Sequence, residues 1–280
     1  MLHRPKKFAM VELSLLGLVV AGYAGSVYWT SYIRALGQAA DHCQNQRQDL
    51  AMNRLKRAVL LPPHGRLVDH WALCLNFQSY LYIQQNQPDW AEKRLKLIER
   101  RSGICEAVRS LCFYRRAEIN DLKGFPNEAR ACREQAQERF EAGKEELESR
   151  QLWKPLALML YGTGDYKGAV DALDHLLRKE WSAPLLFLRW LSLEHAEVPK
   201  AVRLSSCREA LKYETLPARR ACLLAAAAEM EEEESPESAL EAAQACLEEQ
   251  SRLRDAARAD ITAVARRARL GALGRLNRES

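Results

Sequence analysis

The sequence predicts an all-α fold made of helical hairpins that repeat along the chain. Apolar residues recur at helical spacing on both sides of a glycine-containing break within residues 153–176. Small residues open similar helices at several other places, and the strict apolar–polar alternation of half-buried strands is scarce. Glycine and proline number only 13 and 10 among 280 residues, which also favours helices.

The clearest hairpin lies within residues 153–176. Its two apolar faces are Trp153, Leu156, Ala157 and Leu160 before the break, and Ala169, Leu173 and Leu176 after it. The break itself, Gly162–Asp165, contains two glycines, which adopt backbone angles that a helix cannot use. A single hairpin cannot bury two apolar faces alone, so neighbouring repeats are expected.

The same pattern recurs more weakly along the chain. Six small residues open an apolar helix after a turn, namely Ala51, Ala91, Ala129, Ala169, Ala201 and Ala239. These anchor alanines are separated by 40, 38, 40, 32 and 38 residues, near the period of solenoids built from helical pairs. Arg133 replaces one expected apolar residue in the Ala129 repeat. Ser205 and Arg208 replace two in the Ala201 repeat.

This pattern resembles the tetratricopeptide repeat family. The residues that carry the resemblance are Trp153, Leu156, Ala157, Leu160, Gly164, Tyr166, Ala169, Leu173 and Leu176. It covers roughly residues 35–250, although the spacing exceeds the 34 residues usual in the family. The resemblance implies a right-handed helical-hairpin solenoid of about five or six degenerate repeats, with a protein-binding habit but no particular partner. Another all-helical hairpin solenoid is the structural alternative.

The individual helices are expected in order along this domain. Helices are predicted over residues 33–57, 68–84, 103–122, 127–150, 181–193 and 218–230, in addition to the hairpin at 153–176. Pro62-Pro63 ends the first hairpin, and Asn86–Asp89 and Lys123–Pro126 mark later turns. The helix over 127–150 is long and mostly polar, which indicates partial exposure to solvent.

The N-terminal segment predicts a membrane anchor. Residues 1–9 carry three basic side chains, and an apolar run over residues 10–32 follows, with Glu12 as its only charge. About 20 apolar residues span a bilayer, and the aromatic residues near the far end suit the headgroup layer. The positive-inside rule makes residues 1–9 cytoplasmic and the following domain extracytoplasmic. A cleaved signal peptide is the main alternative, and a buried core helix is less favoured.

The C-terminal part is polarised in charge. Residues 229–249 contain nine glutamates and no Lys or Arg, whereas residues 252–278 contain eight arginines. Residues 251–280 are therefore predicted to be a basic capping helix and tail, whose charges face the last hairpin or water. A surface for anionic lipids or an acidic partner is the functional alternative. Nucleic acid is not expected, because the net charge of +5 is mild and the predicted topology is extracytoplasmic.

The cysteines and histidines do not form a recognisable chemical motif. The cysteines are Cys43, Cys74, Cys105, Cys112, Cys132, Cys207, Cys222 and Cys246, with no C-x-x-C pair. Cys74, Cys112 and Cys222 each precede an anchor alanine by 17 residues, which favours structural free thiols. Disulfides remain open, with Cys105 and Cys112 as the first pair to check. Phosphate-loop, dinucleotide, zinc-protease and serine-hydrolase motifs are absent, so no catalytic residue, cofactor or metal is predicted.

The favoured function is a membrane-anchored interaction scaffold or adaptor, for assembly of, or chaperoning at, a membrane or envelope complex. A concave surface formed by the first helix of each hairpin is expected to bind a protein segment. The candidate contact residues are Trp71, Tyr80, Tyr82, Phe113, Tyr114, Arg115, Arg116 and Trp190, for which core packing is the competing interpretation. A self-associating structural protein is the second hypothesis, and a cysteine-dependent enzyme is the least favoured.

Overall fold

The computed structural model describes residues 30–60, 63, 65–251, 265–270 and 272–273. Over these residues the chain is helical and contains no strand, so the all-α prediction is confirmed. Residues 1–9, most of the predicted anchor and most of the predicted tail lie outside the described residues. No helix among those described is long and apolar enough to cross a bilayer.

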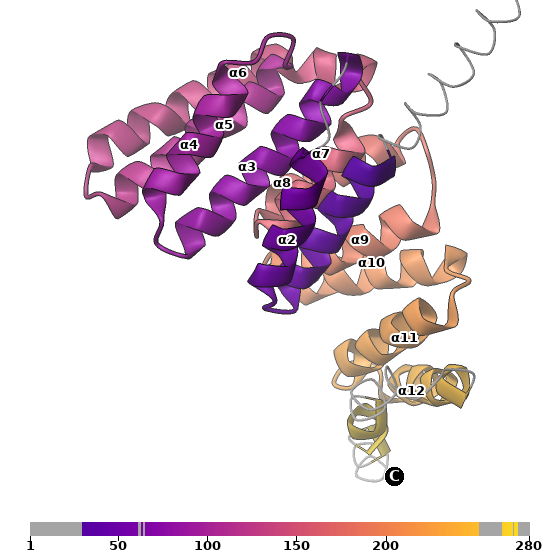
Figure 1. Ribbon diagram of the computed structural model, residues 1–280. Helices are drawn as coiled ribbons and strands as arrows, with labels where there is room; N and C mark the ends of the chain where they lie inside the picture. The colour runs from indigo at the N-terminus through magenta and orange to yellow at the C-terminus, as the bar shows by residue number, and fades with distance from the viewer. Residues whose placement is uncertain (1–29, 61–62, 64, 252–264, 271, 274–280) are drawn as a thin grey trace, which may run out of the picture. The chain divides into compact units, whose positions relative to one another are not determined.

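The chain divides into two compact units, Met1–Asp165 and Tyr166–Ser280. Unit 1 contains a helical stretch at residues 30–44, followed by α2 (Gln48–Val59), the short 3-10 helix η1 (Gly65–Leu67), α3 (Val68–Gln84), α4 (Pro88–Glu99), α5 (Glu106–Leu122), α6 (Pro126–Ser149) and α7 (Trp153–Gly162). Unit 2 contains α8 (Tyr166–Leu177), α9 (Ala183–His195), α10 (Lys200–Tyr213), α11 (Pro217–Glu231), α12 (Pro236–Ser251) and a helical stretch at 265–270. Consecutive helices pack in pairs, most extensively α5 with α6 and α11 with α12 (Figure 1).

The hairpin turns of unit 1 share one backbone geometry. A residue with positive φ ends the first helix of each hairpin, at Gln46 (58°), Asn86 (55°), Gly124 (77°) and Gly164 (80°). Each of these precedes an anchor alanine by five residues. The amide of the following residue then donates a hydrogen bond to a carbonyl in the last turn of that helix. In the α3–α4 hairpin, for example, the N–H of Gln87 donates to the carbonyl of Tyr82 at 2.8 Å. This left-handed cap satisfies helix-terminal carbonyls, so the repeat has a common local structure.

Burial of the anchor alanines confirms five of the six predicted positions. Ala51, Ala91, Ala129, Ala169 and Ala239 are each fully buried. Ala201 is exposed, so the prediction for this repeat is wrong. α10 instead buries Ser206, Cys207 and Ala210, because exposed polar side chains occupy the offsets at which the repeat expects apolar ones. α10 therefore contacts its neighbours through a later turn.

The first helices of unit 1 pack against one another. A Cβ atom added to Gly162 of α7 would lie 2.5 Å from the ring of Phe77 in α3 and 2.8 Å from Cα of Ala40. The side chain of Gln44 also donates to the carbonyl of Tyr161 at 3.0 Å. Because only glycine fits at this crossing, α7 lies in close contact with α3 and with the helical stretch at residues 30–44.

Packing at the start of unit 1 extends into the predicted anchor. Tyr32 and Leu36 are fully buried, so the packed domain begins no later than residue 32. The helical stretch at 30–44 runs through residue 35, at which the repeat domain was predicted to begin. The helix continues across that position because its apolar periodicity carries on from one segment to the next.

The long helix predicted over residues 127–150 is present as α6 (Figure 1). Most of its side chains are exposed, and it buries Ala129, Ala136, Gly143 and Leu147. A Cβ atom added to Gly143 would lie 2.3 Å from the backbone nitrogen of Ala107 in α5. The backbones of α5 and α6 therefore touch at Gly143.

A buried carboxylate joins three parts of unit 1. Asp69 of α3 is fully buried and accepts hydrogen bonds from the N–H of Cys105 at 2.7 Å and from Arg150 at 3.0 Å. Arg150 also donates to the carbonyl of Gly103 at 2.7 Å. Burial raises the pKa of Asp69, and the two hydrogen bonds only partly oppose this shift. This Asp69 node fixes the start of α5 and the end of α6 against α3.

In unit 2, the glutamate-rich stretch makes ion pairs with arginines of the same unit. Glu231 is almost fully buried and accepts hydrogen bonds from Arg208 Nε at 2.8 Å and from Ser238 at 2.7 Å. Arg220 pairs with Glu249 at 3.1 Å. These acidic side chains therefore stabilise the packing of α10, α11 and α12.

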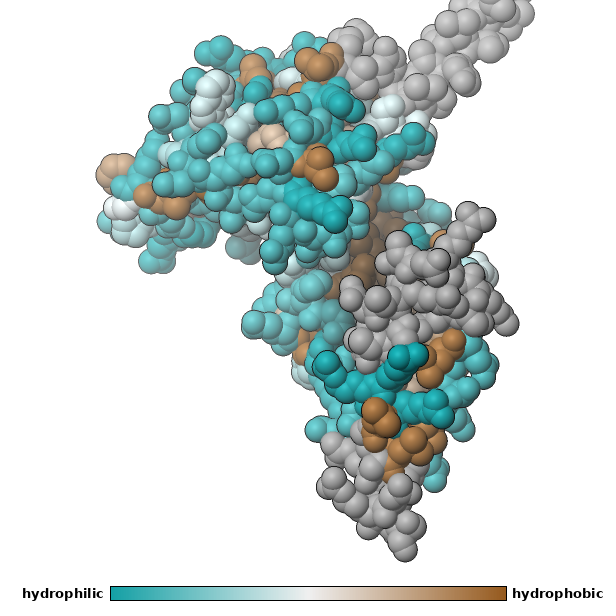
Figure 2. Space-filling view, turned by 60° about the horizontal axis from the view of Figure 1, so that its bottom comes forward, coloured by the Kyte–Doolittle hydropathy of each residue, from teal (hydrophilic) through white to brown (hydrophobic). Residues whose placement is uncertain are grey.

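One face of the molecule, seen in Figure 2, is mostly hydrophilic with small groups of apolar side chains.

Candidate functional site

Seven of the eight predicted contact residues are buried or half-buried, and Tyr114 alone among them is exposed, at 41%. Arg115 is 7% exposed and donates to Asn76 Oδ1 at 3.2 Å and to Glu118 at 2.7 Å. Its guanidinium group lies 5.0 Å from the ring centroid of Tyr80. The structure therefore brings Arg115 and Tyr80 together, in an internal contact between α5 and α3.

A second internal cluster contains Arg116 and Phe113. Arg116 pairs with Glu99 at 2.7 Å and with Glu92 at 3.4 Å, both on α4. The guanidinium groups of Arg116 and Arg139 lie 6.0 Å and 4.9 Å from the ring centroid of Phe113. These contacts hold α4, α5 and α6 together. Arg116, a predicted contact residue, therefore also stabilises the packing of these helices.

The remaining predicted contact residues lie apart from these clusters. Trp71 donates to the carbonyl of Val59 at 3.4 Å, and Tyr82 is 8% exposed beneath the ring of Trp90 at 6.2 Å. Trp190, in unit 2, is 4% exposed and donates to Glu194 at 3.1 Å. Their role in partner binding stays a prediction, but within unit 1 the structure does not gather the seven candidate residues there into one open surface.

Unit 2 contains a groove that sequence reasoning missed. A cavity of about 330 Å³ lies between α8, α9 and α10 and is lined by Asp174, Leu177, Arg178, Trp181, Leu186, Arg189 and Glu209. We call it the Trp181 groove. Leu177 and Leu186 form buried apolar walls, whereas Trp181 is 57% exposed. The Trp181 ring lies 5.6 Å from that of Tyr213, which is also half exposed.

The charges of the Trp181 groove are only partly paired. Arg189 donates to Asp174 at 2.5 Å and to Ser206 at 3.0 Å, and Glu209 lies 4.0 Å away. Arg178 forms no ion pair with any residue that the structure describes. The groove therefore combines exposed aromatic surface, apolar walls and one uncompensated cation, a composition typical of protein interfaces.

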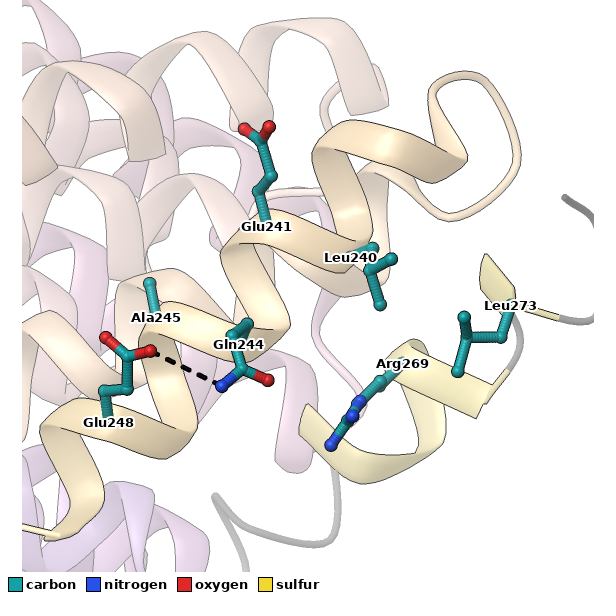
Figure 3. Close-up of a pocket in the computed structure, with 7 residues that line it drawn as sticks. All are labelled: Leu240, Glu241, Gln244, Ala245, Glu248, Arg269 and Leu273. Carbon is teal, nitrogen blue, oxygen red and sulfur yellow. Dashed lines mark hydrogen bonds between the residues drawn. The ribbon is translucent and has the colours of Figure 1, made fainter.

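A second groove lies beside α12 and has an acidic rim. It encloses about 470 Å³ between α12 and the helical residues near the C-terminus, and its lining is Leu240, Glu241, Gln244, Ala245, Glu248, Arg269 and Leu273. Leu240 and Gln244 point toward the segment that carries Arg269 and Leu273, and Gln244 donates to Glu248 at 3.4 Å (Figure 3). Its lining contains no aromatic side chain, unlike that of the Trp181 groove.

The cysteines are free thiols in the structure. Cys105 precedes α5 and Cys112 lies two turns further along the same helix, a rise of about 10 Å that a disulfide cannot bridge. Burial raises the pKa of Cys43 to about 11 and the pKa values of Cys112 and Cys207 to about 12, so these thiols are protonated near neutral pH. Across the described ranges, no group of three or more His, Cys, Asp or Glu side chains could hold a metal ion.

Comparison with protein-family models, with curated proteins and with solved structures finds no match to this chain.

Proposed function

We propose that this chain is a tetratricopeptide-like helical-repeat scaffold that binds a segment of a protein partner and is tethered to a membrane by the part of residues 10–32 that precedes the buried Tyr32. Its role would be assembly of, or chaperoning at, a membrane complex. The paired helices, the spacing of the buried anchor alanines and the repeated turn geometry support the fold part of this proposal. The observation that carries the binding function is the Trp181 groove.

The chemistry of the groove indicates which segment it accepts. Tryptophan, tyrosine and arginine dominate the energetics of protein interfaces, and Trp181, Tyr213 and Arg178 supply these three side chains at one place. Asp174 already neutralises Arg189, whereas Arg178 is available to a carboxylate. The preferred segment therefore carries a large apolar side chain beside an acidic residue.

Selection from a displayed library of random peptides tests this proposal. The full chain, purified in detergent, is immobilised, and enriched peptides are expected to place an aromatic or long aliphatic residue next to Asp or Glu. Trp181→Ala is expected to abolish enrichment, and Arg178→Ala to remove only the acidic preference. Trp90→Ala is the matched control, because Trp90 is a similarly exposed tryptophan, at 49%, in unit 1. Enrichment that survives Trp181→Ala would show that binding occurs elsewhere.

Protease protection tests the membrane tether and its orientation. In cells whose plasma membrane is exposed but intact, external protease is expected to degrade the repeat domain without added detergent. Protection until detergent is added would place the domain in the cytoplasm and contradict the predicted orientation. Release of the domain by salt or carbonate washing would contradict the tether itself.

A further inference from the structure

The outward side of α4 mixes cations with exposed apolar side chains. Ala91, Leu95 and Ile98 are fully buried on the inner side of this helix. The opposite side presents Trp90, Lys93, Lys96, Leu97 and Arg100, which we call the α4 outer face. Trp90 is 49% exposed and Leu97 is 42% exposed. Lysine and arginine together with exposed tryptophan and leucine are residue types that helices lying on membrane surfaces carry.

The cations of the α4 outer face lack acidic partners. Arg116 of α5 engages both glutamates of the helix, Glu92 at 3.4 Å and Glu99 at 2.7 Å. Lys93 Nζ lies 4.1 Å from the ring centroid of Trp90. Within the described ranges Lys93, Lys96 and Arg100 form no ion pair, and Asp89 at the start of the helix is the only acidic residue on this side. The face therefore carries net positive charge.

The preceding repeat shows the same composition. The outward side of α2 and its C-terminal end present Leu50, Arg54, Lys56, Arg57 and Leu60. Leu50 is 45% exposed and Leu60 is 81% exposed. Arg54, Lys56 and Arg57 form no ion pair with any described residue. Two successive second helices, α2 and α4, thus direct cations and apolar side chains to solvent. Packing of the buried face of each repeat requires only that the outer face be hydrophilic, so it does not explain the exposed apolar side chains.

We propose that the α4 outer face lies against a bilayer surface that contains anionic lipids. Lysine and arginine attract phosphate-bearing headgroups, and tryptophan prefers the boundary between headgroups and acyl chains. Leu97 adds apolar surface at the same depth as Trp90, because the two residues are separated by two helical turns along one stripe. This composition fits a lipid surface better than an acidic protein, which would need the cations but not the exposed Trp90. The inference uses the proposed tether only to bring unit 1 to the membrane.

Quenching of tryptophan fluorescence by brominated acyl chains tests the contact in the full chain. The chain is reconstituted into brominated phosphatidylcholine vesicles with or without phosphatidylglycerol, and the Trp90 contribution is the difference between the wild type and Trp90→Phe. This contribution is expected in the anionic vesicles and not in the neutral ones. Lys93→Glu with Lys96→Glu is expected to remove most of it. Lys123→Glu with Lys154→Glu, an equal charge change at exposed lysines outside the α4 outer face, is expected to leave it intact.

Flotation with neutral vesicles separates this inference from the proposed tether. A chain that floats with neutral vesicles, but whose Trp90 is never quenched, is tethered and yet does not lay α4 on the lipid, which overturns the inference alone. Equal loss of quenching in the two double variants would show a bulk charge effect and also overturn it. Trp90 quenching in anionic vesicles by a chain that fails to float with neutral ones would support the α4 contact and contradict the tether.

Discussion

The contact between the backbones of α5 and α6 can be tested by adding a single methyl group. In Gly143→Ala the new Cβ would lie 2.3 Å from the backbone nitrogen of Ala107, 2.9 Å from the carbonyl carbon of Glu106 and 3.1 Å from Cα of Ala107. All three are backbone atoms, so no flexible side chain can move aside. The two helices must separate locally, which disturbs the most extensive helix pair of unit 1.

The expected loss of stability follows from two opposing effects. Overpacking of this kind costs about 1–3 kcal/mol and sometimes more. Replacing a helical glycine by alanine returns about 0.5–1 kcal/mol because the unfolded chain loses conformational freedom. The net decrease in the free energy of unfolding of Gly143→Ala is therefore about 1 kcal/mol, equivalent to roughly 2–4 °C in Tm for a unit of this size.

Gly37→Ala is the matched control. The nearest atom to its added Cβ is Leu158 Cδ1, at 3.9 Å, which is an ordinary van der Waals distance. This variant is expected to gain about 0.5–1 kcal/mol, because only the helix-propensity effect remains. Denaturant unfolding of the full chain, followed by far-UV circular dichroism, measures both variants. The reasoning is refuted if Gly143→Ala is as stable as the wild type, or if Gly37→Ala is destabilised to the same extent.

Three further predictions concern buried polar groups and thiols. Gln78 is fully buried, and neither of its side-chain polar atoms has a hydrogen-bond partner in the described structure. Gln78→Met is therefore expected to raise the free energy of unfolding by about 1 kcal/mol in denaturant titrations. A decrease would reveal an unseen partner such as water. Asp69→Asn is expected to destabilise the chain much less than Asp69→Ala. The asparagine oxygen can still accept the hydrogen bond from the Cys105 N–H, and burial already disfavours the charged form of Asp69. Thermal melts that rank the two variants in the opposite order would contradict this reasoning. Burial raises the pKa values of Cys112 and Cys207 to about 12 in the folded chain, so the unfolded chain loses these thiol protons at lower pH. Each thiol should therefore lower the free energy of unfolding by about 1 kcal/mol on going from pH 9 to pH 10, because the unfolded thiols are already partly ionised at pH 9. This alkaline loss, measured by denaturant titration, should shrink in the Cys112→Ala/Cys207→Ala double variant.

The fold could be predicted from the sequence at positions where the structure requires one particular type of residue. Fully buried alanines open five second helices because two helices can approach closely only over a small side chain. Gly124 and Gly164 also indicated the turns in which they lie, and both adopt positive φ. Gln46 takes the same conformation without a glycine signal, so the turn before α2 was not visible locally.

The candidate site was less predictable because composition does not reveal orientation. α3 buries nearly its whole circumference, including Asn76 and Gln78, and its aromatic residues pack inside unit 1. A helix that is buried over most of its circumference leaves little surface for a partner, and its aromatic content does not reveal this. Trp181, by contrast, lies between two helices and directly before Ser182, the N-cap of α9. The sequence prediction included Trp181 in the helix over residues 181–193, whereas α9 begins at Ala183, so helical periodicity alone did not indicate the Trp181 groove.

The crossing at Gly162 has a consequence for how this protein can change in evolution. In an open solenoid each repeat touches only its neighbours, so repeats can be duplicated or deleted with little effect on the others. Here Tyr161 is hydrogen-bonded to Gln44, 117 residues earlier, and Gly162 fits between Ala40 and Phe77. Inserting or removing one hairpin between them would destroy this closure. This contact therefore constrains the number of hairpins in unit 1 more than it constrains the sequence of their exterior.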